Sequence, residues 1–373
     1  MISRLYVHNY RCLENFELTL AAHRSVLLIG RNGAGKSTVG VVLEILQRIA
    51  RGTNRIGDLV GVDDITQGRR ETPVRFEIEA AVGGASYRYA IVLELPPRFR
   101  ELRVSQERLS IDGRDVLIRD AAEVRLTRAG DDRNARFALD WHLAALPIVQ
   151  EQAEEDPISV FRLWLANLLV LRPMPQLMKG ESAAETNRPD AAVTDFGAWF
   201  SGLVASAPSV YGTIDRFLKQ VIPDLQDIKN PRVGRDSRSL TVQFARGDAT
   251  FSLPFESLSD GEKCFAACAL VLAAKEVYEP LVCFWDEPDN YLAPSEVGFI
   301  TMALRRAFRE GGQLILTSHN PEAIRRFSDE NTFALLRNSH LEPALVRSIA
   351  ALRADEMLQG NLVEALLRGD VTA

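Results

Sequence analysis

The sequence predicts an α/β fold with a mixed central sheet, an antiparallel β layer in its N-terminal half and a helical lobe. Three observations support this prediction. A short apolar strand at 25–29 leads through a glycine-rich loop into a helix at 36–50. Short alternating strands follow over about 74–140. From 261 to 327 helices alternate with apolar strands, which is typical of a parallel sheet covered by helices.

The first fifty residues are expected to form strands, a turn and a helix. Alternating residues predict strands at 2–8 and 14–20, joined by a turn at 9–12. The run at 25–29 is apolar throughout and ends in glycine, so it is expected to be a buried strand. From Lys36 to Ala50 valine, leucine and isoleucine recur at helical spacing, which predicts an amphipathic helix.

The middle of the chain changes from strands to helices. Strands are predicted at 74–80 and 87–93, with a hairpin turn at Gly83-Gly84 and another turn at Asp112-Gly113. This β layer contains no catalytic grouping. Residues 158–225 are mainly helical in pattern. Within that stretch the exceptions are a possible strand at 168–171 and a polar loop at 180–195.

The last part of the chain returns to alternating elements. We expect strands at 239–245 and 249–254, a helix at 261–278, a strand at 281–285, a helix at 294–310, a strand at 313–317 and a helix at 321–327. The domain prediction follows from these changes in pattern. A discontinuous core would comprise 1–157 and 226–373, and a helical lobe at 158–225 would be inserted into it.

The composition is that of an ordinary globular protein. Hydrophobic residues make up 46% and charged residues 25%, and no apolar run approaches the roughly 18 residues of a membrane span. No signal peptide is recognisable, so we expect a cytoplasmic location and no membrane partner. The net charge of -6 does not indicate nucleic-acid binding by itself. Buried reduced thiols are expected at Cys12, Cys264, Cys268 and Cys283.

The glycine-rich loop predicts a nucleotide site. Gly30–Ser37 reads Gly-Arg-Asn-Gly-Ala-Gly-Lys-Ser and matches Gly-x4-Gly-Lys-Ser/Thr between a strand and a helix. Its backbone N–H groups and the helix dipole would hold phosphates. Lys36 would bridge the β- and γ-phosphates as part of catalysis, and Ser37 would bind Mg²⁺. The expected nucleotide contacts are Asn32, Gly33, Ala34, Gly35, Lys36, Ser37 and Thr38.

Two acids and a histidine follow apolar strands. Asp286 and Glu287 end the strand at 281–285, which is where open α/β sheets place their ligands. Asp286 is suited to hold Mg²⁺ through water, and Glu287 to position or deprotonate the attacking water. His319 follows the next strand and can contact the γ-phosphate or the water. Surface acids and a structural histidine are the alternative, and the lysine loop argues against it.

A third motif begins a helix. Leu258–Lys263 reads Leu-Ser-Asp-Gly-Glu-Lys, and its N–H groups and the Ser259 hydroxyl would form an anion-binding end. Taken alone, Ser-Asp-Gly-Glu is simply a good helix start.

Together these motifs resemble the P-loop ATPase heads of the ABC class, with Walker A, signature, Walker B and switch histidine. The residues of the signature motif resemble those of the SMC, RecF and OLD branch of this class. Leu5–Arg11 is similar to the first strand and turn of that branch, which adds Arg11 to the expected nucleotide contacts. Residues 286–294 resemble the OLD-like Walker B and D-loop, and 318–321 continue the likeness. Ala293 departs from the histidine that the branch often has.

The resemblance implies a mechanism. Two copies would meet head to tail around two ATP molecules, so that Ser259 and Gly261 contact the γ-phosphate held by the partner copy. The D-loop, including Asp289, would run along the interface. A Q-loop glutamine is also expected. Gln176 is the best candidate for it, with Gln150 and Gln106 as rivals.

The spacing of the motifs narrows the function. Only about 220 residues separate Ser37 from Ser259, too few for coiled-coil arms, and few follow His319, so we expect a compact head without a nuclease domain. The favoured function is an ATP-hydrolysing dimeric switch in DNA repair, recombination or anti-phage defence, with a separate effector such as a nuclease.

Three alternatives remain open at this stage. They are a RecF-like mediator at DNA gaps, an ATP-regulated scaffold for an effector nuclease or toxin that does not bind DNA, and a membrane-transporter subunit. The residues of the signature motif and the antiparallel β layer argue against a membrane-transporter subunit. Direct DNA binding would need an exposed basic face, for which the candidates are Arg51, Arg55, Arg69, Arg70, Arg98, Arg100 and Arg103.

Overall fold

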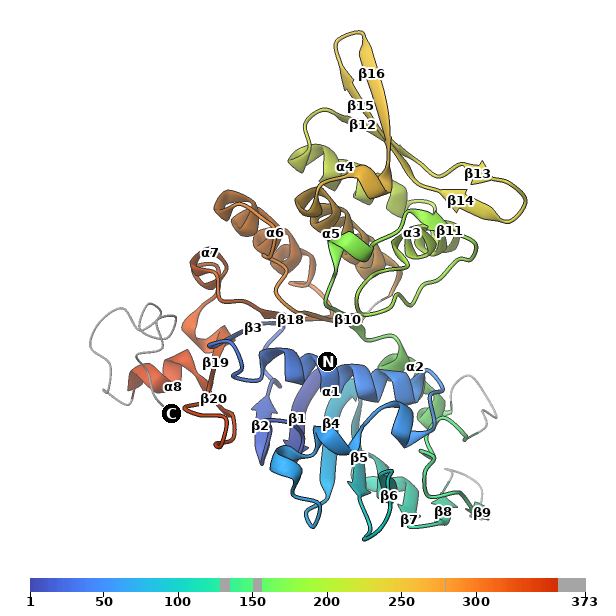
Figure 1. The fold of residues 1–373 in the computed structure, drawn as a ribbon, viewed down its shortest axis with the longest axis vertical. Helices are drawn as coiled ribbons and strands as arrows, with labels where there is room; N and C mark the ends of the chain where they lie inside the picture. The colour runs from blue at the N-terminus through green and yellow to red at the C-terminus, as the bar shows by residue number, and fades with distance from the viewer. Residues whose placement is uncertain (128–134, 150–155, 279, 355–373) are drawn as a thin grey trace. The chain divides into compact units, whose positions relative to one another are not determined.

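The computed structural model describes residues 1–127, 135–149, 156–278 and 280–354. The chain divides into two compact units (Figure 1). Unit 1 comprises Met1–His23, Leu28–Leu168 and the described residues of Asp329–Ala373, and unit 2 comprises Arg24–Leu27 and Leu169–Ser328.

Unit 1 contains an antiparallel sheet of eight strands among the described residues, in the order β2-β1-β4-β5-β6-β7-β8-β9. The strands are β1 (Ile2–His8), β2 (Phe16–Thr19), β4 (Val74–Val82), β5 (Ala85–Glu94), β6 (Arg103–Ile111), β7 (Arg114–Asp120), β8 (Glu123–Leu126) and β9 (Ala135–Ala138). Gly83 and Gly84 both have positive φ, as a tight hairpin requires. Both predicted turns are confirmed, because Val82 pairs with Ala85 and Ile111 with Arg114.

The two faces of this sheet differ in chemistry. On one face Phe76, Ile78 and Tyr89 are fully buried. Helix α2 (Pro157–Ala166) packs there, with Phe161 stacked on Tyr87 at a centroid distance of 5.3 Å. The helix α1 (Lys36–Ala50) adjoins α2.

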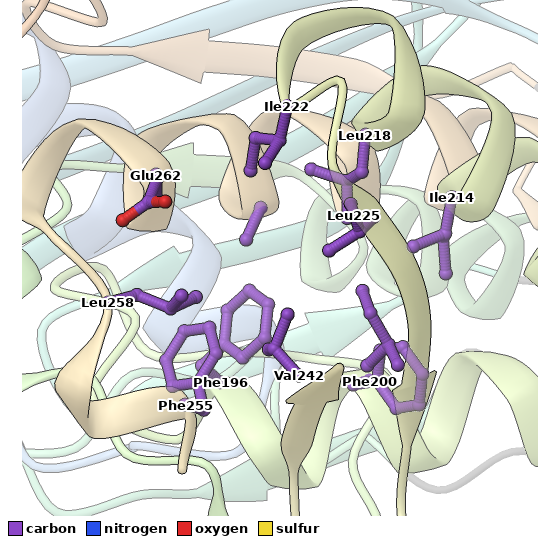
Figure 2. Close-up of a pocket in the computed structure, with 12 residues that line it drawn as sticks. Phe196, Phe200, Ile214, Leu218, Ile222, Leu225, Val242, Phe255, Leu258 and Glu262 are labelled. Carbon is purple, nitrogen blue, oxygen red and sulfur yellow. The ribbon is translucent and has the colours of Figure 1, made fainter. Parts of the chain in front are cut away.

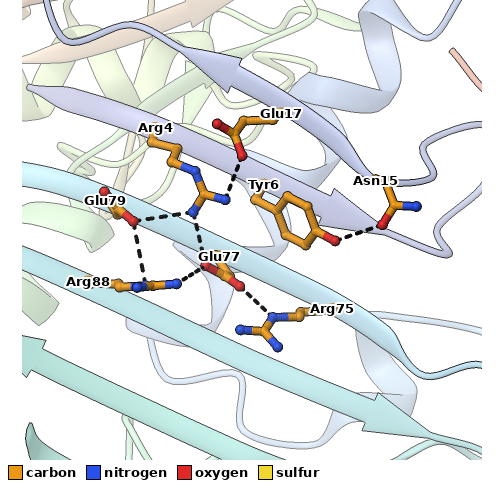
Figure 3. Close-up of polar contacts among 8 residues, drawn as sticks. All are labelled: Arg4, Tyr6, Asn15, Glu17, Arg75, Glu77, Glu79 and Arg88. Carbon is orange, nitrogen blue, oxygen red and sulfur yellow. Dashed lines mark hydrogen bonds and ion pairs between the residues drawn. The ribbon is translucent and has the colours of Figure 1, made fainter. Parts of the chain in front are cut away.

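The opposite face carries a network of ion pairs (Figure 3). Glu77 lies at its centre with only 4% of its side chain exposed, and it accepts hydrogen bonds from Arg75, Arg4 and Arg88. Burial raises the pKa of Glu77, but the hydrogen bonds from Arg88 and Arg4 outweigh this effect, so the pKa lies below its ordinary value.

The second sheet is mixed. In unit 2, β10 (Leu169–Leu171), β17 (Val282–Trp285) and β18 (Gln313–Thr317) are parallel neighbours in that order. The strand β3 (Ser25–Ile29) comes next, beginning in unit 2 and ending in unit 1. In unit 1 it is followed by β19 (Thr332–Leu336) and β20 (Leu345–Ser348), which are antiparallel to each other. The predicted mixed sheet is therefore confirmed.

The described residues of unit 2 also form helices and two small antiparallel sheets. Its helices are α3 (Phe196–Ser206), α4 (Val210–Val221), α5 (Asp260–Val277), α6 (Pro294–Ala307) and α7 (Pro321–Ile324). One small sheet has the order β12 (Leu225–Lys229), β15 (Thr241–Arg246), β16 (Ala249–Pro254), and the other β11 (Glu181–Ser182), β14 (Ser237–Ser239), β13 (Arg232–Val233). α5 is largely buried, which suits its run of small and apolar residues.

The boundaries differ in detail from the prediction. The helix expected to reach 310 ends at Ala307, ahead of Gly312, whose φ is +74°. The strands β19 and β20 and the short helix α8 (Ile349–Ala354) were not predicted. The helical lobe at 158–225 stays a prediction, with α2 in unit 1 and α3 and α4 in unit 2. Within the described part of the chain, no helix combines the length and apolar character needed to cross a membrane.

Glu77→Gln tests the ion-pair network. Because its pKa is lowered in the folded state, the Glu77 carboxylate stabilises the fold above the ordinary carboxyl pKa, and this contribution is lost as the pH falls through the lowered value. We expect the variant to lower the free energy of unfolding by about 1–3 kcal/mol near neutral pH, and the difference from wild type to shrink below about pH 4. Urea unfolding at several pH values measures this.

Glu79→Gln is the matched control, since Glu79 lies in the same network but is 30% exposed. It should change the free energy of unfolding by less than about 1 kcal/mol. A Glu77→Gln effect that is the same at acidic and neutral pH would contradict the proposed charge contribution.

Candidate functional site

The predicted phosphate loop joins β3 to α1 in unit 1. Gly35 has a φ of +106°, and a Cβ at this residue would lie 3.0 Å from Cys12 Sγ. A Cβ at Gly30 would lie 2.5 Å from the Leu335 carbonyl oxygen. Both residues therefore need to be glycine, because each combines a positive φ with close packing at its Cβ position. In the described part of the chain, no side chain caps the start of α1, which leaves its first N–H groups suited to an anion.

Lys36 is folded back over this loop. It is 5% exposed, and its Nζ donates to the Gly30 carbonyl oxygen at 2.8 Å. The ammonium is thus held at the glycine-rich loop rather than in solvent. Such a buried cation beside backbone N–H groups fits a phosphate group. Thr38 Oγ1 lies 3.8 Å from Cys12 Sγ on the following turn.

Two arginines adjoin the loop or its neighbouring turn. The predicted contact Arg11 pairs with Asp64 at 2.8 Å, has positive φ and is 44% exposed. Arg337 donates to the Gly33 carbonyl oxygen at 3.1 Å. Sequence reasoning missed Arg337, although it directly follows β19, as the acids of the Walker B-like segment follow β17. The sequence did contain a signal for Arg337, because a charged residue immediately follows an apolar strand there.

In unit 2 the ends of β17 and β18 are tied together by Thr317. Its hydroxyl donates to Asp286 Oδ1 at 2.6 Å and accepts from the Glu287 N–H at 2.9 Å. Thr317 is fully buried and Trp285 pairs with Leu316, so the two strand ends are in register. Thr317 directly precedes the predicted Ser318-His319 segment, but no role was predicted for its hydroxyl. One hydroxyl therefore holds the Asp286 carboxylate and the backbone of Glu287.

Glu287 is held from two sides. Its Oε2 accepts from Asn290 Nδ2 at 3.0 Å, and its Oε1 lies 3.3 Å from His319 Nδ1. The Glu287 side chain is 24% exposed and that of His319 is 53% exposed, so both can reach a ligand. The φ of Glu287 is +49°, which is a strained conformation for a residue other than glycine. The structure thus brings the predicted catalytic glutamate and histidine together.

Asp289 is held behind this cluster. The Ser318 hydroxyl donates to Asp289 Oδ2 at 2.7 Å, and both residues are buried. Burial raises the pKa of Asp289, although the Ser318 hydrogen bond opposes the shift. Its side chain therefore positions the D-loop from inside, and a role as a direct nucleotide contact stays a prediction.

The predicted signature begins α5. Ser259 is the N-cap, and its side chain and that of Glu262 form a capping box. A Cβ at Gly261 would lie 3.1 Å from the Tyr291 carbonyl oxygen, so glycine allows the D-loop to approach closely. Gln176 Nε2 donates to Asp260 Oδ2 at 2.5 Å. This places the Q-loop candidate at the signature.

The remaining predictions fall into three groups. Gln106 lies in β6 of unit 1, while Gln150 lies outside the described residues. The predicted magnesium ligands Ser37 and Asp286 belong to different units, so their pairing stays a prediction. The cysteines are buried and reduced as expected, and among the described residues no group of three or more His, Cys, Asp or Glu could hold a metal.

A family model matches residues 25–325 of the chain. Its description is "AAA domain, putative AbiEii toxin, Type IV TA system". No curated protein matches the sequence.

Solved structures of SMC heads are similar over nearly the whole chain. One is an SmcHead bound to the C-winged helix domain of ScpA, with 15% identity, a TM-score of 0.54, and coverage of 95% of this chain and 99% of that chain. A second is an Smc head domain from Pyrococcus furiosus with an extended coiled coil, bound to the C-terminal domain of ScpA. It has 14% identity, a TM-score of 0.51, and coverage of 95% and 98%. The SMC head domain from Thermotoga maritima has 12% identity, a TM-score of 0.47, and coverage of 93% and 98%. The first two show that this chain has an SMC-head-like fold.

Gly35→Ala tests the loop geometry. The alanine would adopt a left-handed backbone and its Cβ would press on Cys12 Sγ, so we expect a loss of about 1–3 kcal/mol in the free energy of unfolding. Gly212→Ala is the control, because Gly212 lies within α4 with no atom near its Cβ position. That change should stabilise the protein by about 0.5–1 kcal/mol. Denaturant unfolding should therefore show a lower free energy of unfolding for Gly35→Ala and a higher one for Gly212→Ala. A change in the same direction for both variants would contradict the loop geometry described above.

Proposed function

The chain belongs to the AAA-domain family whose description names an AbiEii toxin and a type IV toxin–antitoxin system, and we propose that it is an ATP-hydrolysing switch that closes as a dimer around two ATP molecules. The observation that carries this proposal is the cluster at the ends of β17 and β18. There Glu287 lies 3.3 Å from His319, its carboxylate accepts from Asn290, and Thr317 bonds the Glu287 N–H and the Asp286 carboxylate. An oriented carboxylate beside a histidine is suited to activate water.

Each group in the proposed site has a separate task. The loop from Gly30 to Thr38 binds the phosphates, with Lys36 neutralising charge on the β- and γ-phosphates. Ser37 and Asp286 are the residues that would hold Mg²⁺, which would supply charge stabilisation for the leaving phosphate oxygens. Glu287 orients the water and accepts its proton. His319 contacts the γ-phosphate and thereby senses whether it is present.

The second half of each site comes from a partner copy in this proposal. Ser259 and the backbone at Gly261 contact the γ-phosphate bound by the other copy, and the D-loop segment Asp289–Leu292 lies along the interface. The close approach of Gly261 to Tyr291 supports this, because it links the signature to the D-loop within one chain. ATP then shifts the equilibrium toward the dimer, and hydrolysis reverses it.

We further propose that the switch acts through a separately encoded effector. The family description names a toxin–antitoxin system, which supports a regulatory partner in defence. The RecF-like alternative would require a free basic face. However, Arg55, Arg69 and Arg103 each pair with a carboxylate, at 2.8, 2.6 and 2.7 Å. Three of the seven candidate arginines are therefore already paired within the chain, which weakens the support for a basic DNA-binding face.

Glu287→Gln and Lys36→Ala test the switch. The first should retain ATP without hydrolysing it, so an ATP-dependent dimer should accumulate in sedimentation velocity. The second should lower ATP affinity at least about tenfold, because a buried phosphate-binding cation is lost. Lys179→Ala is the control, since Lys179 is exposed and outside the motifs. If Glu287→Gln stays monomeric with ATP, the dimer proposal fails.

Thr317→Val tests the orientation of the acids. Valine preserves the shape but removes the hydroxyl that bonds Asp286 and the Glu287 N–H. We expect ATP turnover to fall about 10- to 100-fold while ATP binding is retained. Thr317→Ser keeps the hydroxyl and should retain most of the turnover. Equal turnover in the valine variant and wild type would contradict the role assigned to Thr317.

A further inference from the structure

At the start of α5 the Ser259 hydroxyl donates a hydrogen bond to a neighbouring carboxylate. Glu262 Oε2 accepts from the Ser259 hydroxyl at 2.7 Å and from the Ser259 N–H at 2.8 Å. In return the Glu262 N–H donates to Ser259 Oγ at 3.3 Å. Ser259 is exposed, so the same hydroxyl faces the surface of unit 2.

This arrangement prevents the Ser259 hydroxyl from donating to a phosphate at the same time. A serine hydroxyl has one proton to donate, and an ionised carboxylate can only accept. The oxygens of an ionised γ-phosphate are likewise acceptors. While Ser259 donates to Glu262, it cannot donate to a phosphate. The Glu262 carboxylate additionally places a negative charge beside the helix end that would receive a triphosphate.

The surroundings of Glu262 keep its carboxylate in this place. Its side chain lines a small cavity of about 20 Å³ whose other walls are apolar (Figure 2). The walls include Phe255, Leu258, Leu225 and Ala266. Turning an ionised carboxylate into such a cavity would be costly, because no polar group there could replace its hydrogen bonds. The cavity therefore offers the carboxylate no alternative position, and its hydrogen bonds to Ser259 hold it at the solvent side.

We propose that Glu262 is a brake on closure of the ATP-bound dimer, an inference that rests on the proposed function. Closure requires the Ser259 hydroxyl to leave Glu262 and turn to the partner's γ-phosphate, against the repulsion of the Glu262 charge. The brake weakens the dimer and favours its opening once the γ-phosphate is gone. Glu262 is thus a positioning residue that acts through Ser259.

Glu262→Gln separates the brake from the helix cap. A glutamine Oε1 in the position of Oε2 can accept from both the Ser259 N–H and the Ser259 hydroxyl, so the cap is kept, but a neutral amide oxygen holds the hydroxyl more weakly than a carboxylate does. The Ser259 hydroxyl then turns to a phosphate at a lower cost, and the negative charge is gone. We expect the ATP-bound dimer to form at about tenfold lower protein concentration. ATP affinity of the dilute monomer should not change, because the phosphate loop is untouched.

The measurement uses the full chain carrying Glu287→Gln, so that ATP persists. Sedimentation velocity over a protein dilution series with ATP and Mg²⁺ gives the dimer dissociation constant, and a fluorescent ATP analogue on dilute protein gives the monomer affinity. Glu262→Asp is a second variant, since it keeps the charge but has a side chain one methylene shorter. Its dissociation constant should lie between that of the protein with the native glutamate and that of the Glu262→Gln variant.

Two controls isolate the effect. Glu296 caps α6 in a similar way, with its Oε2 accepting from the Ala293 N–H at 2.7 Å, but no hydroxyl is involved. Glu296→Gln should leave the dissociation constant of the ATP-bound dimer unchanged. In a Ser259→Ala background, Glu262→Gln should strengthen the dimer less than it does with Ser259 present, since only the charge effect remains.

The outcomes distinguish this inference from the function on which it rests. A tighter dimer with unchanged monomer affinity supports the brake. A dimer that forms in the Glu287→Gln protein but is equally strong or weaker with Glu262→Gln overturns the brake alone. If no dimer forms with either residue at 262, the dimer and the brake are overturned together.

Discussion

The candidate catalytic cluster depends on one buried hydroxyl. Thr317 bonds both the Asp286 carboxylate and the Glu287 N–H, and it can do so because β17 and β18 are parallel and in register. Parallel neighbours end at the same edge of a sheet, so residues 31 positions apart meet there. Without this bond Glu287 would lose the restraint on its left-handed backbone, and His319 would face a less ordered carboxylate.

Strain at this edge is compensated by local bonds. Glu287 and Tyr291 both have positive φ, which costs about 1–3 kcal/mol per residue outside glycine. The Thr317 and Asn290 hydrogen bonds hold Glu287, and the buried Ser318–Asp289 pair holds the segment between the two strained residues. Side-chain hydrogen bonds therefore hold Glu287 and Asp289 in place, which suits a segment proposed to lie at an interface.

Much of this architecture was predictable because its signals are local. The strands at 25–29 and 313–317 and the helix at 36–50 occur as predicted, since glycine, apolar runs and helical spacing mark their ends. Partners supplied by distant segments were not predictable. Arg337 reaches Gly33 across 304 positions, and Thr317 has no motif that marks it as a partner of the acids. Such contacts depend on sheet order, which local patterns do not encode.

At the signature, the residues that stabilise the start of α5 also oppose the binding of a phosphate there. Acidic residues at the first turn of α5 favour the helix, because they complement its dipole and complete the capping box. The same charges oppose the approach of a phosphate to that helix end. Gln176 bonds Asp260 and Ser259 bonds Glu262, so both acids are satisfied within the chain. If this helix start binds a phosphate as proposed, the Ser259–Glu262 bond must first break, which would weaken that binding.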